Sequence, residues 1–310
     1  MSIERISPVL LAVVLTGLSA AAQAITVGVS MALFDDNFLT EVRASMKERA
    51  GELHVPVQFE DAENDIGRQL DQIQNFIAQH VDAIIVNPVD TDATPRMTQL
   101  ATAAGIALVY VNRMPADRRL PPRVSFVGSD ETQSGTLEMA EVCRLLGGRG
   151  DIVVLMGELT NQSARQRTRD IENVIARPAC RGIRVLDQQA ANWKRTEAAD
   201  LVTNWLSAGL RPAAVVANDD EMAIGAIQAL KQAHLLGSTV VAGIDATPDG
   251  LAAMKAGELR VTVFQNGPAQ GRGAIDTALE LARHGQAPAF VWVPFELVTP
   301  GNLSSYLGHH

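Results

Sequence analysis

The sequence has few of the residues from which metal centres and nucleic-acid surfaces are built. It contains two cysteines, Cys143 and Cys180, so a zinc site made of cysteines is not expected. Its six histidines form no H-E-x-x-H motif. Lys and Arg number 26 against 35 Asp and Glu, a formal net charge of −9, whereas phosphate binding needs Lys and Arg massed on one face. We therefore expect neither a metal ion nor nucleic acid as a partner.

Several enzyme motifs are missing as well. Gly28 stands alone after the first apolar run, without the G-x-G-x-x-G of dinucleotide-binding folds, and no G-x-x-x-x-G-K-[ST] loop occurs to hold nucleotide phosphates. The G-x-S-x-G turn of one large hydrolase class is also absent. Carboxylates are plentiful, but nothing pairs them as acid and base. The sequence favours a protein that holds a molecule over an enzyme, and it indicates no cofactor.

The first residues, 1–24, have the pattern of a secretory signal peptide. Arg5 supplies a thin basic start, residues 8–18 form an apolar core, and Ala22-Gln23-Ala24 is a cleavage signature of small residues. No later segment is long and apolar enough to span a bilayer. We predict export and cleavage after Ala24, with an uncleaved N-terminal anchor as the alternative.

Export would place the two cysteines under oxidising conditions, in which a pair is often bridged. Cys143 falls late in one expected helix, and Cys180 falls between the next helix and its following strand. We predict a disulfide between them, a bond that needs Cα atoms within about 7 Å. Two free thiols are the alternative.

From residue 25 onward, buried-strand patterns alternate with helical ones. A first set of strands is expected at 25–31, 55–60, 83–88, 107–113 and 124–130, separated by helices with apolar residues at three- and four-residue steps. A second set is expected at 151–157, 183–189, 213–219, 239–245, 261–266 and 291–299. Strands separated by helices form parallel sheets covered on both faces. The two sets predict an α/β protein with two doubly wound parallel-sheet lobes.

Ligands of doubly wound sheets bind beyond the carboxyl ends of the strands. The residues that overrun the expected strands are polar and distinctive, and they are the ones to inspect for ligand contacts: Asp35-Asp36-Asn37-Phe38, Asn112-Arg113, Asn218-Asp219-Asp220, Asp245 and Gln265.

Five segments together carry a resemblance to a known family: NPVDTDA (87–93), SARQR (163–167), ANDDEMAIGA (217–226), GIDATPDG (243–250) and VFQN (263–266). With these, the chain resembles the periplasmic solute-binding proteins of sugar importers, of the ribose-binding type. GNL at 301–303 resembles their inositol-binding branch. The resemblance covers nearly the whole mature length and implies that the protein acts in the periplasm.

The resemblance implies a type I periplasmic binding protein fold, in which three crossing strands join two lobes that close over one ligand by hinge motion. The crossings are expected near Ser129, Gln265 and Phe295. The lobes are then 25–129 plus 266–295 at the N-terminal side and 130–265 plus 296–310 at the C-terminal side.

The resemblance also implies a set of ligand-binding residues: Asp36, Phe38, Asn112, Arg113, Arg165, Trp193, Asn218, Asp245 and Gln265. A carboxylate accepts hydrogen bonds from two adjacent hydroxyls, an Arg fork donates to vicinal hydroxyls, and an amide does both. The flat faces of Phe38 and Trp193 suit the C–H faces of a sugar or cyclitol ring.

Structural roles compete with binding at these positions. Asp245 can cap the helix that opens at Thr247-Pro248, and Asn218 can close a turn. Arg113 and Arg165 can form surface or interlobe salt bridges, and the aromatic residues can pack in the core. Arg167 can take the place of Arg165, since both lie in the same turn of one expected helix.

Three departures from the ribose-binding pattern argue against ribose and leave the polyol class intact. Asn112 stands where that pattern has Asp, and Ile244 stands where it has an aromatic residue. The loop at 31–38 is longer, with Asp35-Asp36 in place of an Asn pair, so either Asp can face the ligand. The mixture of carboxylates and arginines favours an uncharged polyhydroxyl ligand, because a sugar acid or phosphate would need unopposed positive charge.

We therefore predict a receptor, expected to be monomeric, that binds a sugar or cyclitol and presents it to the membrane permease of an ABC importer. A receptor for a chemotaxis or sensor-kinase partner would use the same cleft, and sequence does not separate the two. The effector domain of a sugar-responsive repressor is less favoured, because a helix-turn-helix segment should precede it and a signal peptide does instead.

Overall fold

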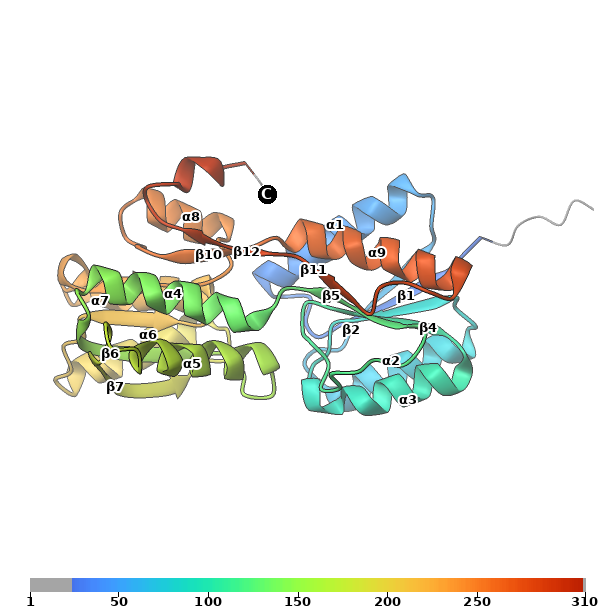
Figure 1. The fold of residues 1–310 in the computed structure, drawn as a ribbon, viewed down its shortest axis with the longest axis horizontal. Coiled ribbons are helices and arrows are strands. Elements are labelled where there is room, and N and C mark those ends of the chain that lie inside the picture. The colour runs from blue at the N-terminus through green and yellow to red at the C-terminus, as the bar shows by residue number, and fades with distance from the viewer. Residues whose placement is uncertain (1–23, 309–310) are drawn as a thin grey trace, which may run out of the picture.

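The computed structural model describes residues 24–308. The predicted signal peptide lies outside these residues, apart from Ala24 at its predicted cleavage site. Within the described part of the chain, no helix has the length and hydropathy needed to cross a membrane. The described residues form two α/β lobes side by side, as the sequence predicts (Figure 1).

The first lobe, here called the N-lobe, is built on a sheet with the spatial order β11-β5-β4-β3-β1-β2, and all of its pairings are parallel. Its strands are Val27–Met31 (β1), Val57–Asp61 (β2), Ala83–Val86 (β3), Ala107–Val111 (β4), Val124–Gly128 (β5) and Phe290–Trp292 (β11). Its helices are Asn37–Glu52 (α1), Ile66–Ala78 (α2), Thr94–Ala104 (α3), Gly267–His284 (α9) and the short 3₁₀ turn Thr91–Ala93 (η1).

The second lobe, the C-lobe, is built on a parallel sheet with the order β7-β6-β8-β9. Its strands are Arg149–Met156 (β6), Gly182–Ala190 (β7), Ala214–Ala217 (β8) and Val240–Ala242 (β9). Its helices are Glu131–Leu145 (α4), Gln162–Ile175 (α5), Arg195–Ser207 (α6), Asp220–Gln232 (α7) and Pro248–Lys255 (α8), with 3₁₀ turns at Leu236–Ser238 (η2) and Leu303–Ser305 (η3).

Apolar side chains on both faces of each sheet explain the layering. Strands β1, β3, β4 and β5 are buried at every position, as expected for strands covered by helices on both sides. In the N-lobe, α1 and α9 pack on one face and α2 and α3 on the other. In the C-lobe, α6, α7 and α8 cover one face, and α4 and α5 cover the other. Each lobe therefore has its own core.

The chain passes between the two lobes at three places. It leaves the N-lobe sheet after β5, returns from Thr262–Gln265 (β10) into α9, and leaves again between β11 and Phe295–Val298 (β12). β10 and β12 pair with each other as an antiparallel ribbon, in which Gln265 lies opposite Phe295. Residue boundaries for the lobes stay a prediction, but these passages lie close to the expected crossings at Ser129, Gln265 and Phe295.

The last predicted strand, 291–299, is wrong as a single element. It is divided into β11, which pairs with the N-lobe sheet, and β12, which pairs with β10. The break falls at Val293-Pro294, and proline cannot donate the backbone hydrogen bond that a continuous strand needs. β11 and β12 are both partly buried and both carry apolar residues, so the sequence pattern alone shows them as one apolar run.

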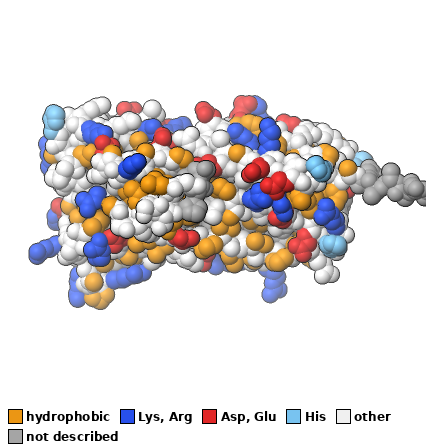
Figure 2. Space-filling view, turned by 90° about the horizontal axis from the view of Figure 1, so that it is seen from above, with side chains coloured by type: hydrophobic (Ala, Val, Ile, Leu, Met, Phe, Trp, Pro, Cys, Tyr) orange, Lys and Arg blue, Asp and Glu red, His pale blue; other side chains and the backbone are white. Residues whose placement is uncertain are grey.

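Acidic and basic side chains are interspersed over both lobes on the face shown in Figure 2, without a large area of one sign. This distribution is unlike the massed positive charge that binds nucleic acid.

The predicted disulfide is confirmed. Cys143 near the end of α4 is bonded to Cys180 in the turn before β7, with Cα atoms 5.7 Å apart. Both cysteines are buried among the apolar residues that α4 and α5 contribute to the C-lobe core. The two cysteines lie 37 positions apart in the sequence, and the bond joins α4 to the loop that follows α5.

Replacing both cysteines by alanine should lower the free energy of unfolding by about 2–5 kcal/mol, because the unfolded chain regains the freedom of the closed loop. Urea denaturation of the oxidised protein and the double variant measures this difference. An equal midpoint and slope for the two proteins would show that the bond contributes nothing to stability.

Candidate functional site

A cavity of about 420 Å³ lies between the lobes, within the range of small-molecule sites. Its N-lobe residues follow the carboxyl ends of β1, β2 and β4, and its C-lobe residues follow β6, β7, β8 and β9. Several lining residues are also helix N-caps, whose side chains accept backbone N–H groups at the cleft end of α1, α5, α7 and α8: Asp36, Asn161, Asp219 and Thr247. The cleft is therefore where strand ends and helix N-termini of both lobes meet.

Most of the residues predicted from the sequence are brought together here. The cavity is lined by Asp36, Phe38, Asn112, Arg113, Trp193, Asp245 and Gln265. Asp35 lines it too, but it is exposed, whereas Asp36 is partly buried and accepts a 2.8 Å hydrogen bond from the Leu39 amide. Arg165 and Asn218 are not among the lining residues in the described part of the chain.

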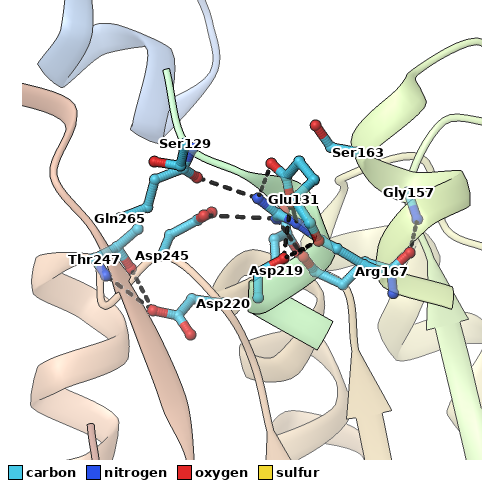
Figure 3. A network of polar contacts seen from close by, with 12 residues as sticks. Ser129, Glu131, Gly157, Ser163, Arg167, Asp219, Asp220, Asp245, Thr247 and Gln265 are labelled. Atoms are coloured by element: carbon cyan, nitrogen blue, oxygen red, sulfur yellow. Dashed lines mark hydrogen bonds and ion pairs between the residues drawn. The ribbon is translucent and has the colours of Figure 1, made fainter. Parts of the chain in front are cut away.

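Arg167, not Arg165, is the arginine of α5 that lies in the cleft. Its guanidinium is buried and forms a fork with Glu131, with Nε 2.9 Å and Nη2 3.0 Å from the carboxylate oxygens. It also donates to the Asn218 carbonyl at 2.7 Å and to Gln265 Oε1 at 3.2 Å. Asp245 Oδ1 lies 3.7 Å from Nη1 (Figure 3). Burial opposes the charge, but Glu131 and Asp245 outweigh it and raise the pKa of Arg167.

Asp245 is held by backbone contacts rather than used as a helix cap. Its N–H donates to Val263 at 2.8 Å, and its carbonyl accepts from the Gln265 N–H at 3.2 Å. The cap of α8 is Thr247, whose hydroxyl accepts from Gly250 N at 3.1 Å, so the capping alternative for Asp245 is wrong. Burial raises the pKa of Asp245 well above its ordinary value, although Arg167 opposes this shift.

The backbone around the cleft is strained at three of the predicted residues. Asn112 has φ +65°, Trp193 has φ +63° and Asp245 has φ +117°. Residues other than glycine rarely adopt positive φ, at a cost of about 1–3 kcal/mol each. Such strain persists where the surrounding structure fixes it, and it is common at ligand sites.

Several buried polar atoms around the cleft have no hydrogen-bond partner among the described residues: Asp245 Oδ1, Gln265 Nε2, Trp193 Nε1 and Asn218 Nδ2. A buried polar group without a partner costs about 1–3 kcal/mol. The first three belong to cavity-lining residues. They offer one acceptor and two donors, a combination that matches hydroxyl groups, which both donate and accept.

Asn218 lies behind the cavity wall, at the end of β8. Its Oδ1 accepts from the Gly157 N–H at 3.2 Å and from the Thr168 hydroxyl at 3.2 Å. Its carbonyl accepts from Arg167. Asn218 thus joins β6, α5 and β8 beneath the cleft, in addition to any contact that its Nδ2 makes.

Arg165 spans the two lobes at the rim of the cleft. Its Nη2 donates to Thr91 Oγ1 at 3.2 Å and to Asp92 at 3.1 Å, both in η1 of the N-lobe. Its Nη1 donates to the Leu159 carbonyl at 2.7 Å in its own lobe. The geometry agrees with the interlobe salt bridge that was the alternative for this residue.

Further polar contacts hold the lobes together beside the cavity. Asn37 donates to Glu221 at 2.8 Å, and Asn64 donates to Glu158 at 3.0 Å. Thr91 N–H and Oγ1 both reach the Thr160 carbonyl, at 3.3 and 3.2 Å. These contacts join segments that follow β1, β2 and β3 to segments of the other lobe, so the structure is a closed arrangement of the lobes.

Arg113 supplies a second buried cation from the N-lobe side. Its Nη1 donates to the Pro88 carbonyl at 3.0 Å. Burial lowers its pKa, and the nearby Glu158 and Asp36 oppose this shift. Glu158 lies across the cleft from Arg113, and its own pKa is raised by burial. Both lobes therefore present charged groups to the cavity.

Acidic residues outnumber basic ones in the cavity lining. The acids are Asp35, Asp36, Glu158, Asp219, Glu221 and Asp245, and the bases are Arg113, Arg167, Lys194 and Arg195. Burial raises the pKa of Asp36, Glu158, Asp219 and Asp245. Among residues 24–308, no cluster of His, Cys, Asp and Glu side chains has the arrangement of a metal site.

Some lining residues were not assigned to the site from the sequence: Asn64, Glu158, Asn161, Ser163, Arg195 and Glu221. Asp219 stood among the residues that overrun a strand, and its position at the end of β8 was the signal that could have placed it. Glu158 follows β6 at the same spacing, whereas the others lie farther from a strand end, and only the folded loops bring them to the cavity.

Burial raises the pKa of Asp220, beneath the Asp245 loop, to about 7. Its oxygens accept from Thr247 N at 2.8 Å and Thr262 Oγ1 at 2.8 Å, and these bonds oppose the shift. The folded chain thus holds this proton more tightly than the unfolded chain, in which an Asp has a pKa of about 3.9. The contribution of Asp220 to stability is therefore lost as pH rises from about 4 to about 7.

Asp220→Asn should remove this pH dependence. Between pH 5 and 8, wild-type stability should fall by on the order of 2 kcal/mol more than that of the variant. Urea denaturation at both pH values measures the two slopes, whatever the baseline stability of the variant. Equal slopes would contradict the raised pKa.

Known proteins share this fold. Residues 27–287 match the periplasmic binding protein domain. The chain is 56% identical over 293 residues to a Rhizobium meliloti protein provisionally named a rhizopine-binding protein, covering 94% of this chain and 95% of that one. It is 37% identical over 249 residues to the xylitol-binding protein of Mycolicibacterium smegmatis, covering 80% of this chain and 70% of that one.

The fold is also similar to solved structures. The crystal structure of an ABC transporter solute-binding protein from Bacillus halodurans with bound myo-inositol matches with a TM-score of 0.87 and 39% identity. The match covers 92% of this chain and 98% of that one. Together with the two-lobed α/β architecture and the interlobe cavity, these similarities show that the chain belongs to the periplasmic binding protein domain family.

Proposed function

We propose that this protein is a periplasmic solute-binding receptor that captures a neutral sugar or cyclitol between its lobes and delivers it to an ABC importer. Like the similar solute-binding proteins, it binds its ligand without transforming it. The single observation that carries the proposal is that three residues lining the interlobe cavity, Asp245, Gln265 and Trp193, each carry a buried polar atom without a hydrogen-bond partner in the described part of the chain. Ligand hydroxyls would satisfy these atoms and recover the free energy that their burial costs.

The proposed contacts divide between polar groups and ring faces. Asp245 accepts from two ligand hydroxyls, while Arg113 and Arg167 donate to others from opposite lobes. Phe38 and Trp193 cover the C–H faces of the ligand ring from the N-lobe and the C-lobe. Because the ligand contacts both lobes, only the closed form makes all of these contacts, so binding shifts the population towards closure.

The names of the relatives narrow the ligand class. Rhizopine, xylitol and myo-inositol appear in them, and the last two are uncharged compounds rich in hydroxyl groups. We therefore favour a cyclitol or related polyol for this chain over ribose, in line with Asn112 and Ile244. A sugar acid would face the carboxylates that line the cavity.

We place the mature protein in the periplasm, with its leader removed after Ala24, and we expect a monomer. Its proposed partner is the membrane permease of an ABC importer, because the similar Bacillus halodurans protein is an ABC transporter component. A chemoreceptor or sensor kinase would dock on the outer lobe faces and would leave the ligand chemistry unchanged.

A ligand panel tests the proposal. Isothermal titration and thermal shift with myo-inositol, other inositols, rhizopine, xylitol, pentoses and hexoses should find a saturable ligand that raises the melting temperature, because it binds only the folded state. Gluconate and inorganic phosphate serve as anionic controls and should not bind. A panel in which only the anions bind, or none of the compounds does, would contradict the proposal.

Asp245→Asn keeps the shape of the side chain and tolerates positive φ, but it replaces a charged acceptor of two hydroxyls by an amide. Affinity for the best ligand of the panel should fall by about 2–4 kcal/mol, roughly thirty- to a thousand-fold. The matched control is Asp82→Ala, which removes the exposed acceptor of the Thr26 N–H just before β3, at the opposite end of that strand from the cavity. This control should cost about 1 kcal/mol of stability and leave affinity unchanged. Wild-type affinity for Asp245→Asn would remove it from the site.

Arg165→Ala should act on closure rather than on the ligand. Loss of the contacts with Thr91 and Asp92 destabilises the closed form by about 0.5–1.5 kcal/mol, which raises the dissociation rate roughly two- to ten-fold. Adding Asp92→Ala should cause little further change, because the two residues share one contact. Arg184→Ala, which breaks an exposed pair with Asp151 inside the C-lobe, is the control. A hundred-fold loss of affinity in stopped-flow measurements would instead place Arg165 on the ligand.

A further inference from the structure

We propose that Gly157 is a positioning residue of the cleft, whose missing side chain sets where Trp193 stands and so how much room a ligand has. The inference deepens the proposed function and rests on it. Gly157 is the first residue after β6 and is buried. It is absent from the cavity lining in the described part of the chain, so it acts through its neighbours.

The indole of Trp193 occupies the space that a side chain at position 157 would need. A Cβ built on Gly157 would lie 2.1–2.3 Å from Cζ2, Cη2 and Cε2 of Trp193. Ordinary contacts of a Cβ begin at 3.4 Å, so an alanine here forces the ring to move by more than an ångström. Gly157 does not have a positive φ. The position therefore needs glycine for space and not for backbone conformation.

Trp193 has little freedom to move elsewhere. Its backbone is in the left-handed region at φ +63°, next to Asn192 at φ +53°, in the short connection between β7 and α6. The Arg167 guanidinium lies 5.9 Å from the ring centroid. The open space beside the ring is the cavity that it lines. A ring displaced from Gly157 thus enters the volume of the ligand and turns its unpartnered Nε1 away from its present direction.

Gly157 also orients the Asn218 amide. Its N–H donates to Asn218 Oδ1 at 3.2 Å, which leaves the Nδ2 group as the free end of that side chain. Figure 3 shows this contact on the C-lobe side of the network around Arg167. One residue without a side chain thereby fixes an aromatic ring of the cavity wall and an amide group that lies behind this wall.

A single-tryptophan background tests the positioning without any ligand. Trp205→Phe and Trp292→Phe leave Trp193 as the only indole. Adding Gly157→Ala should then change the acrylamide quenching constant of Trp193 about two-fold. Gly28→Ala is the matched control, because its Cβ would meet the Phe76 ring at 2.5 Å in the N-lobe core, away from the cavity. Equal quenching in Gly157→Ala and Gly28→Ala would overturn the proposal.

Titration with myo-inositol tests the consequence for binding. A displaced ring in a fitted pocket should weaken affinity by about ten-fold or more, the range in which one methylene discriminates ligands. Gly28→Ala should stay within two-fold of wild type, and an equal affinity loss in both variants would overturn the inference. If quenching shows that Trp193 has shifted but the affinity is unchanged, the inferred link between the position of Trp193 and ligand binding is overturned. If wild type fails to bind myo-inositol and every other panel member, the proposed function fails, while quenching still decides the positioning.

A second pair of variants covers the case in which Gly157→Ala folds poorly. Trp193→Ala removes the ring that the new methyl group would meet, so Gly157→Ala should cost much less stability in that background than in wild type. Equal costs in the two backgrounds, measured by urea denaturation, would show that the ring is not what position 157 accommodates.

Discussion

The cleft depends on one buried cation, Arg167. Removing a guanidinium from water is expensive, and only a close partner with satisfied hydrogen bonds offsets the cost. Glu131 supplies the fork, and the carbonyl of Asn218 and the amide of Gln265 take further N–H groups. These partners come from α4, the end of β8 and the end of β10, so one side chain ties together three elements that border the cavity. The C-lobe side of the cleft is thereby held in place by contacts within the protein itself.

The carboxylates around Arg167 show that the site is not arranged for stability. Burial raises the pKa of Asp219, Asp245 and Glu138, and each of these groups would be more stable in water as a charge. Asp245 adds a strained backbone and an oxygen without a hydrogen-bond partner in the described chain. A binding protein keeps such costs where a ligand recovers them, which is the usual trade between stability and function.

Much of the fold was predictable because each lobe repeats one simple pattern. Fully buried strands alternate with amphipathic helices, and that alternation fixes two doubly wound sheets and places polar strand ends at one edge. The disulfide followed from export and from the position of both cysteines in one lobe. The division of the last strand was not predicted, since Val293-Pro294 lies inside an apolar run and only the pairing of β11 and β12 with different sheets reveals the break.

Two features of the site could not be predicted from the sequence pattern. Arg165 and Arg167 lie two positions apart on α5, so about 200° separates their directions, and sequence alone does not say which one faces the cleft. The role of Gly157 arises from its contact with the ring of Trp193, which belongs to a loop distant in sequence, so no local sequence pattern indicates it.

If the proposed function is right, the buried polar atoms of the cleft that lack hydrogen-bond partners in the described chain are the ligand contacts. A high-resolution crystal structure of the complex with the tightest ligand of the panel tests it most directly. We predict ligand hydroxyls within hydrogen-bonding distance of Asp245 Oδ1, Gln265 Nε2 and Trp193 Nε1, between lobes that keep the contact of Arg165 with Asp92. A ligand bound outside the cleft, or one that leaves Asp245 without a contact, would contradict the account.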